Sequence, residues 1–191
     1  IVIKINKTDL DGFLVIEPKC FHDSRGFFLE TYQKEIYLSA GIKDTFVQDN
    51  QSRSTKGVLR GMHFQVKRPQ AQIITVLRGC IYDVGVDLRV NSPTFGQSFG
   101  LQLSEEGPRQ IYMEPGFAHG FCVLSDVVDL HYKVSRIYDP SDECGLHWND
   151  PEINIKWPSI DFEVNKRDNN YQFLANLKDN NMLPHYPPLE I

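Results

Sequence analysis

Hydrophobic and polar residues alternate with a period of two along the middle of the chain. The clearest stretch is 81–89, where every second side chain is apolar, namely Tyr82, Val84, Val86 and Leu88. The same alternation recurs at 99–103 and 128–134, and residues 73–77 form a short apolar run rich in β-branched side chains. Successive side chains of a strand point to opposite faces, so this pattern predicts strands, with 81–89 buried on one face.

Turn-forming residues separate these stretches, and helical periodicity is confined to two short segments. The turn signals are Arg78-Gly79, Asn91-Ser92-Pro93, Glu106-Gly107-Pro108, Pro115-Gly116 and Ser125-Asp126. Residues 33–40 predict a helix of two turns that ends at Gly41, and residues 170–177 predict a second short helix. Many short strands at this spacing are typical of a sandwich or barrel, so the predicted fold is all-β with short terminal helices.

Composition narrows the class of protein without naming a function. The chain has 191 residues, and its 20 basic and 25 acidic side chains give a formal charge of −5, which argues against a general nucleic-acid binder. No apolar run approaches the roughly 20 residues of a membrane helix. The length and the absence of a repeat or linker predict one domain over 1–191, and the strand pattern places its all-β core at roughly 2–157.

Several common chemistries leave no trace in the sequence. The cysteines form no C-x-x-C pair, so a zinc knuckle is not expected; they are Cys20, Cys80, Cys122 and Cys144. Dinucleotide-binding, phosphate-loop and nucleophile-elbow motifs are absent as well. No secretory leader pattern opens the sequence, and we expect a cytoplasmic protein with reduced thiols.

Two histidines, His63 and His119, each lie in a segment rich in glycine, and two strands of a barrel would bring them to one cavity. Metal-binding barrels usually offer a His-x-His pair, but position 65 is Gln65, so we expect no metal. A metal-free pocket with histidine suits acid–base chemistry, and Tyr132, in the apolar phase of its strand, faces the core or the cavity. From these residues alone, a structural histidine and a packed core tyrosine are the favoured interpretations.

A series of short motifs becomes specific when its order and spacing are taken together. The motifs are Phe21 to Glu30, Phe46 to Asn50, Leu59 to Gln65, Val84 to Arg89, Ser92 to Gly96, Pro115 to Phe121, Tyr132-Lys133, Tyr138-Asp139-Pro140 and Trp148-Asn149-Asp150-Pro151. Over about residues 13–168 the sequence resembles the dTDP-4-dehydrorhamnose 3,5-epimerase family, sugar-nucleotide epimerases with a cupin-type jelly roll. The resemblance implies a jelly-roll barrel with its core at about 13–168 and a C-terminal extension at 169–191. It also implies an isomerase that needs neither metal nor cofactor.

The resemblance also implies a reaction, the epimerisation at C3, C5 or both of a nucleotide-linked 4-keto-6-deoxy sugar, in deoxysugar and cell-surface polysaccharide biosynthesis. The 4-keto group acidifies the neighbouring carbons, because the carbanion left by proton loss is delocalised as an enolate. A base removes a proton from one face of the ring and an acid returns one to the other. The family's motif places the base at His63, the acid at Tyr132, and the carboxylate that orients the histidine at Asp168.

Substrate-binding positions carry over in the same way. They are Arg25, Glu30, Gln48, Asn50, Arg60, Gln72, His119, Tyr138, Glu143 and Arg167. Arginine suits a diphosphate because its planar fork pairs bidentately with phosphate oxygens, and Tyr138 matches the ring that stacks on the nucleotide base. The family further implies a homodimer that exchanges an N-terminal strand, in which Arg25 and Glu30 serve the partner's site.

The sequence departs from the family at Gln72, where the family usually has a lysine that meets the carbonyl oxygen. A neutral amide is a weaker donor than a charged amine, so we expect weaker oxyanion stabilisation unless Lys67 or Arg68 reaches in. The departure leaves open the nucleotide (dTDP or GDP), the sugar (hexose or heptose) and the centre that is inverted.

Three alternatives stay open on the sequence alone. A 3,4-ketoisomerase of a nucleotide-linked keto sugar would usually carry a second histidine close to the first, where this chain has Gln65. A non-catalytic cupin that binds sugar nucleotides has no need of His63, Tyr132 and Asp168 together, and neither has a structural cupin of the seed-storage kind.

Overall fold

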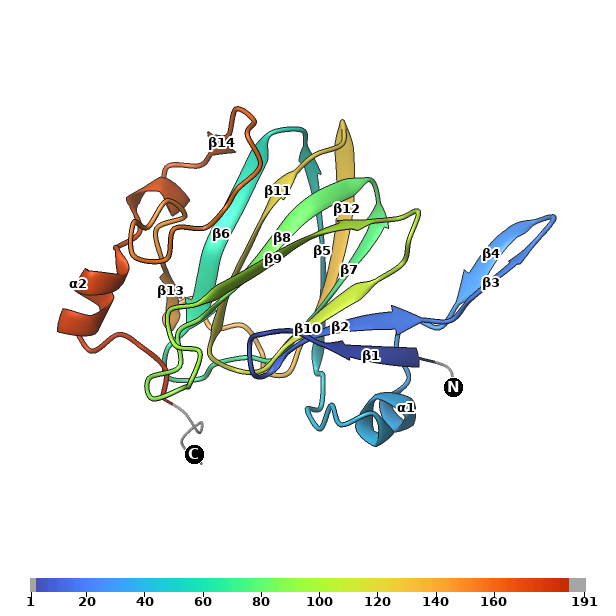
Figure 1. The fold of residues 1–191 in the computed structure, drawn as a ribbon, viewed down its shortest axis with the longest axis horizontal. Coiled ribbons are helices and arrows are strands. Elements are labelled where there is room, and N and C mark those ends of the chain that lie inside the picture. The colour runs from blue at the N-terminus through green and yellow to red at the C-terminus, as the bar shows by residue number, and fades with distance from the viewer. Residues whose placement is uncertain (1–2, 186–191) are drawn as a thin grey trace.

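Two facing sheets form the body of the protein in the computed structural model, which describes residues 3–185 (Figure 1). The first sheet consists, in spatial order, of β1 (Ile3–Lys7), β2 (Phe13–Pro18), β10 (Gln110–Met113), β7 (Gln72–Arg78), β12 (Val127–Val134) and β5 (Gln48–Thr55). The second consists of β13 (Glu143–Gly145), β6 (Val58–Gln65), β11 (Phe117–Val123), β8 (Cys80–Asp87) and β9 (Ser98–Ser104). Neighbours within each sheet are antiparallel, and the short β14 (Glu163–Val164) pairs in parallel with β6.

The strands predicted from alternation are confirmed, but one of them is buried differently from the prediction. Residues 81–89 were expected to bury one face, whereas Asp83 and Asp87, on the polar face, are both fully buried. A Cβ on Gly85 would lie 2.4 Å from the Phe13 ring, so this face of β8 points into the space between the sheets. The opposite, apolar face is covered by the C-terminal segment, which packs Leu177 against it. The expectation of one buried face is therefore wrong, because both sides of β8 are covered.

The two predicted helices are present at slightly different bounds. Helix α1 (Lys34–Ser39) is terminated by Gly41, the predicted stop residue, whose φ is +97°. The backbone amides of Gly41 and Ile42 donate to the carbonyls of Leu38 and Tyr37 respectively, as in a Schellman motif. Helix α2 (Leu174–Asp179) begins four residues later than predicted. A 3₁₀ turn, η1 (Asp168–Asn170), occupies the predicted start, and the Leu174 amide donates to the distant Asp150 carboxylate at 2.6 Å.

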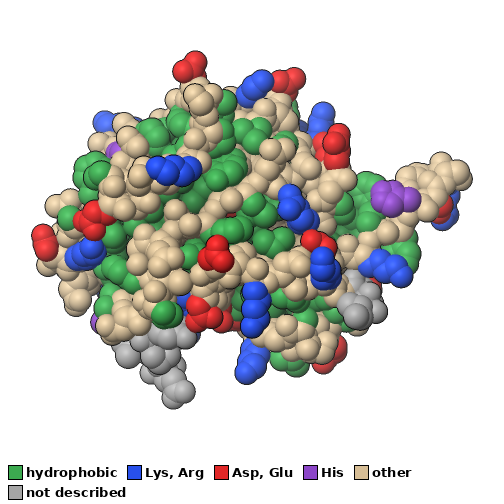
Figure 2. All heavy atoms as spheres, in the orientation of Figure 1, with side chains coloured by type: hydrophobic (Ala, Val, Ile, Leu, Met, Phe, Trp, Pro, Cys, Tyr) green, Lys and Arg blue, Asp and Glu red, His purple; other side chains and the backbone are tan. Residues whose placement is uncertain are grey.

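A hairpin of β3 (Cys20–Asp23) and β4 (Gly26–Leu29) projects from this body, as Figures 1 and 2 show. Three of its aromatic rings are exposed, Phe21 by 49%, Phe27 by 62% and Phe28 by 66%. A lone two-stranded hairpin is only marginally stable in water, and exposed aromatic rings of this kind mark a surface that binds another one. Within residues 3–185 no helix combines the length and the apolar character needed to cross a membrane.

Candidate active site

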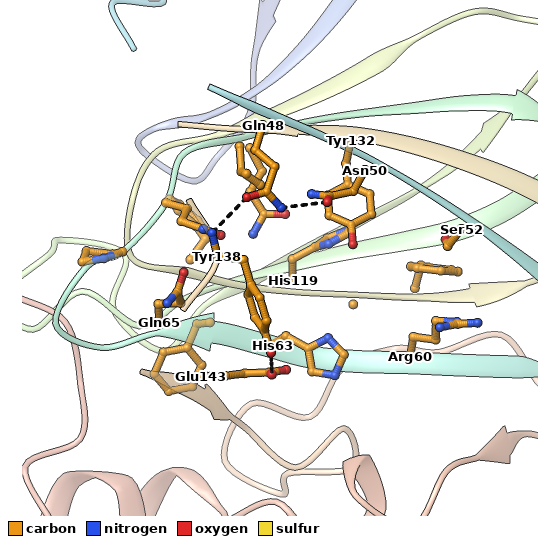
Figure 3. A pocket seen from close by; sticks show the side chains of 18 of the residues that line it. Gln48, Asn50, Ser52, Arg60, His63, Gln65, His119, Tyr132, Tyr138 and Glu143 are labelled. Carbon is orange, nitrogen blue, oxygen red and sulfur yellow. Dashed lines mark hydrogen bonds between the residues drawn. The ribbon is translucent and has the colours of Figure 1, made fainter. Parts of the chain in front are cut away.

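A cavity of about 310 Å³ opens between the two sheets. Strands β5, β7 and β12 line it from the first sheet and β6 and β11 from the second, so its walls come from segments far apart in the sequence (Figure 3). Phe117, Phe121 and Leu130 contribute apolar walls, and polar side chains outnumber them. A concave site of this size with convergent polar groups fits a small-molecule ligand.

Strand β5 provides one polar wall. Its inward side chains Gln48, Asn50 and Ser52 line the cavity and are half-buried, while the intervening ones are exposed. Gln48 donates to Asn50 Oδ1 at 2.8 Å and accepts from the backbone N–H of Tyr138 at 3.0 Å, which links this wall to the loop at the cavity mouth (Figure 3). No apolar alternation marks β5 in the sequence, because its inner face meets the cavity and its outer face meets water.

His63 and Asp168 form a hydrogen-bonded pair at the opposite wall. Nε2 of His63 lies 3.0 Å from Oδ1 of Asp168, whose side chain is fully buried. An ionised carboxylate only accepts hydrogen bonds, so its partner Nε2 carries the hydrogen and Nδ1 keeps the lone pair. Figure 3 shows a nitrogen of the His63 ring turned towards the cavity.

Two glycines allow the close backbone approach that positions this pair. A Cβ on Gly61 would lie 2.6 Å from the Cα of Gly120, and the φ of Gly61 is +124°. The pairing of β6 with β11 shifts register just here, and the Gly61 N–H donates to Oδ2 of Asp168 at 3.0 Å. Gly61 is therefore required by space and by its positive φ, and Gly120 is required by space.

The pKa of Asp168 is strongly lowered. Burial by itself would raise that pKa, but the hydrogen bond and charge of His63, with further hydrogen bonds from Gly61 and Arg167, outweigh burial and lower it to about 2. Asp168 therefore stays ionised at neutral pH and accepts the N–H of the His63 ring, which is what an orienting partner of a general base must do.

Tyr132 reaches into the same cavity from the other sheet. Its phenol extends from β12 towards the space above His63 (Figure 3), and no residue between 3 and 185 hydrogen bonds its hydroxyl. Burial raises the pKa of Tyr132, the nearby Arg60 lowers it, and Glu143 raises it, with a net upward shift. The hydroxyl thus keeps its proton and is free to donate it.

His119 forms a second imidazole–carboxylate pair beside the first. It is directly opposite His63 in the β6–β11 register, as their glycine-rich segments suggested, and its Nε2 lies 2.9 Å from Oδ2 of the buried Asp83. Asp83 fixes the ring, but the sequence analysis did not single it out. The only signal was a carboxylate in the polar phase of 81–89, in the middle of the strand. Residues 3–185 contain no group of three or more His, Cys, Asp or Glu side chains suited to hold a metal ion.

Two arginines are the cationic side chains that line the described cavity, Arg60 and Arg167. Arg60 donates from Nε to Ser54 at 3.0 Å. Arg167 contacts Glu143 and Asp168 at 3.0 Å each, and its Nη2 lies 3.1 Å from Nε2 of His63. Both guanidinium groups can pair with an anionic group in the cavity.

Tyr138 lies at the mouth, 44% exposed. Its hydroxyl donates to the carboxylate of Glu143, which is itself held by Arg167. The ring is thus fixed at its far end and leaves a face available for stacking (Figure 3).

Gln72 lines the cavity from β7, half-buried, with no hydrogen bond from its amide to the described chain. Lys67 and Arg68, expected as substitutes for the family's lysine, do not line the cavity; their side chains are exposed and their backbone amides bind Asp142.

The remaining predicted site residues, Arg25 and Glu30, lie away from the cavity of their own chain. Arg25 is at the tip of the projecting hairpin and pairs with Asp23 at 2.6 Å, not with Glu30, which is exposed. The structure of one chain therefore unites every other predicted site residue and leaves these two on the hairpin.

This chain is similar to known proteins along most of its length. The family model of dTDP-4-dehydrorhamnose 3,5-epimerase matches residues 7–176. The enzyme of that name from Methanothermobacter thermautotrophicus is 45% identical over 169 residues, covering 87% of this chain and 91% of its own. A dTDP-4-dehydrorhamnose 3-epimerase from Streptomyces niveus is 39% identical over 186 residues, covering 96% and 90%.

A solved structure gives the same result for the fold. The crystal structure of dTDP-6-deoxy-D-glucose-3,5-epimerase from Legionella pneumophila, in complex with dTDP-4-keto-L-rhamnose, matches with a TM-score of 0.92 at 45% identity, covering 96% of this chain and 98% of that one. The expectation of a cupin-type jelly roll is confirmed. With most of its length matched by the family model, this chain belongs to the dTDP-4-dehydrorhamnose 3,5-epimerase family of carbohydrate isomerases.

Proposed function

We propose that the protein epimerises a dTDP-linked 4-keto-6-deoxy sugar, with His63 as the base and Tyr132 as the acid. The observation that carries the proposal is that the His63–Asp168 pair and the Tyr132 hydroxyl face one cavity from opposite sheets. Inversion requires proton removal from one face of a carbon and proton delivery to the other, so an acid and a base on opposite walls suit it. Relatives named for dTDP sugars favour that nucleotide over GDP.

The reaction divides into two proton transfers. Nδ1 of His63 takes the proton from the carbon beside the ketone, and the C–H electron pair moves into the ring and onto the ketone oxygen as an enolate. Asp168 stabilises the imidazolium that results. The enolate then collapses to the ketone as its carbon takes the Tyr132 proton on the opposite face. Solvent afterwards protonates Tyr132 and deprotonates His63, so no net proton is consumed.

Binding is assigned to the residues around these groups. Arg60 and Arg167 hold the diphosphate, and Tyr138 stacks on the base. The amide of Gln72 donates to the ketone oxygen as a neutral hydrogen-bond donor. The local arginines thus offset the overall charge of −5 where the anionic ligand binds.

We further propose a homodimer in which the hairpin of β3 and β4 covers the partner's cavity mouth. The projecting hairpin, its three exposed phenylalanines and the position of Arg25 at its tip support this arrangement. In such a dimer Arg25 and Glu30 would reach the partner's cavity, since they lie away from the cavity of their own chain.

Two further proposals concern the whole chain. The packing of α2 on the second sheet supports one domain over 1–191, although 1–2 and 186–191 lie outside the described residues. The four free cysteines support a cytoplasmic location.

Deuterium exchange tests the proposal. The protein is incubated with dTDP-4-keto-6-deoxyglucose in deuterated water, and incorporation at C3 and C5 is followed by NMR. We expect exchange at C3. Exchange at C5 as well would match the relatives named 3,5-epimerases, and its absence would match the relative named a 3-epimerase. His63→Asn should abolish exchange while leaving dTDP affinity unchanged. If the native protein shows exchange neither with this sugar nor with a GDP-linked 4-keto sugar, the epimerase proposal is wrong. If His63→Asn exchanges at the native rate, the assignment of His63 as the base is wrong.

A further inference from the structure

Gln65 carries a buried oxygen that nothing in the described chain satisfies. The residue is 5% exposed and lines the cavity. Its Nε2 donates to the backbone carbonyl of Asp139 at 3.1 Å, which fixes the amide, since the opposite orientation would set two oxygens against each other. Oε1 is the atom left over, and no residue between 3 and 185 hydrogen bonds it.

The position of Gln65 places this oxygen beside the proposed chemistry. His63 and Gln65 are alternate residues of β6 and share its cavity face, about 7 Å apart along the strand. Both are labelled in Figure 3 on the same wall. A hexose ring with its hydroxyl groups spans a similar distance, so a sugar whose reacting carbon meets His63 brings a hydroxyl near Gln65.

The energetics of an unpaired acceptor point to a ligand. A buried acceptor without a donor destabilises a protein, and such atoms are rare. Two of its neighbours cannot serve as donors, because the Asp139 carbonyl and the carboxylate of Glu143, opposite Gln65 in the β6–β13 register, only accept hydrogen bonds. A hydroxyl of a ligand in the cavity can supply the donor.

We propose that Gln65 is a specificity-determining residue that accepts a hydrogen bond from a ring hydroxyl of the substrate's sugar through Oε1. The inference rests on the proposed function and deepens it by naming which part of the ligand is recognised. A site built to accept from a hydroxyl discriminates against sugars that lack it, because Oε1 then stays unpaired in the complex. An amide oxygen accepts at every physiological pH, so this recognition is independent of protonation.

Binding by calorimetry separates this role from a structural one. The variant Gln65→Met keeps the length of the side chain and removes both polar atoms. We expect its affinity for dTDP-6-deoxyglucose, an unreactive probe, to fall roughly 10- to 100-fold, with its affinity for dTDP alone unchanged. The 2-deoxy or the 3-deoxy analogue should bind the native protein correspondingly less tightly, and Gln65→Met should cost no further affinity for that analogue.

Gln110→Met is the matched control. Gln110 is buried like Gln65, with 1% of its surface exposed, but its polar atoms are all used, by Tyr37, Thr31 and Thr75, and it lies outside the cavity. Gln110→Met should lower the thermal midpoint and leave the affinity for the sugar probe unchanged. Gln65→Met should lower the affinity for the sugar probe and leave the thermal midpoint unchanged. An unchanged affinity for the probe in Gln65→Met, or an equal loss for dTDP alone, overturns the proposal. Failure of the proposed function would appear separately, as absent deuterium exchange in the native protein.

Discussion

Replacing Asp168 with asparagine tests the His63–Asp168 pair through both stability and catalysis. The substitution keeps the shape of the side chain but removes the charge that accepts from His63, Gly61 and Arg167 at 3.0 Å each. An amide also offers His63 a donor, which favours the wrong tautomer. By the logic of the serine-protease triad, we expect kcat to fall roughly 10³- to 10⁴-fold.

The stability effect follows from the lowered pKa of Asp168. That pKa falls from 3.8 to about 2 on folding, which corresponds to about 2 kcal/mol of stabilisation at pH 7. Because the folded pKa lies below the unfolded one, the stabilisation is present above about pH 4 and is lost as the pH falls towards 2. Asp168→Asn cannot titrate, so its deficit should shrink from about 2 kcal/mol at pH 7 to about 1 kcal/mol at pH 3.

Urea unfolding measures the stability deficit of Asp168→Asn at pH 7, 5 and 3. The fluorescence of Trp148 and Trp157 reports unfolding, at a fixed protein concentration. Asp150→Asn is the control, since Asp150 is 1% exposed and accepts from three backbone amides outside the cavity, including that of Leu174. It should lose stability and keep the native kcat. A deficit in Asp168→Asn that is equal at pH 7 and pH 3, or a native kcat, would refute the reasoning.

Three further outcomes are expected. Tyr132→Phe should reduce inversion 10²- to 10⁴-fold while His63 still exchanges the proton of the reacting carbon, so NMR would show deuterium incorporation without inversion; inversion at the native rate contradicts the acid assignment. Dimers re-formed from equal amounts of Arg25→Ala and His63→Asn should regain about a quarter of native activity, since each mixed dimer restores one complete site; a mixture as inactive as its parents speaks against the shared site. Gln72→Lys should raise kcat on the order of 10-fold, because a charge-assisted donor stabilises the enolate better, and an unchanged or lower kcat would show that Gln72 does not meet the ketone oxygen.

The sequence alone determined those elements whose cause is local. Alternation in 128–134 and 99–103 predicts strands because a strand with one face in the core repeats every two residues, and the structure confirms both. Gly41 marks the end of α1 because a left-handed residue there costs glycine little. The motifs around His63 and His119 identify the family, which the comparisons confirm.

Tertiary structure decided what depends on partners distant in the chain. Strand β5 escaped the apolar pattern because its inner face lines a cavity, and Asp83 lies in the polar phase of β8, which turns into the barrel. The start of α2 is fixed by Asp150. The position of Arg25 likewise depends on more than the sequence, because within one chain the residue lies on a hairpin, away from the site predicted for it. Periodicity records whether a face meets apolar surroundings; it does not record whether a polar face meets water, a ligand or a buried partner, and that distinction arises only when the sheets close on each other.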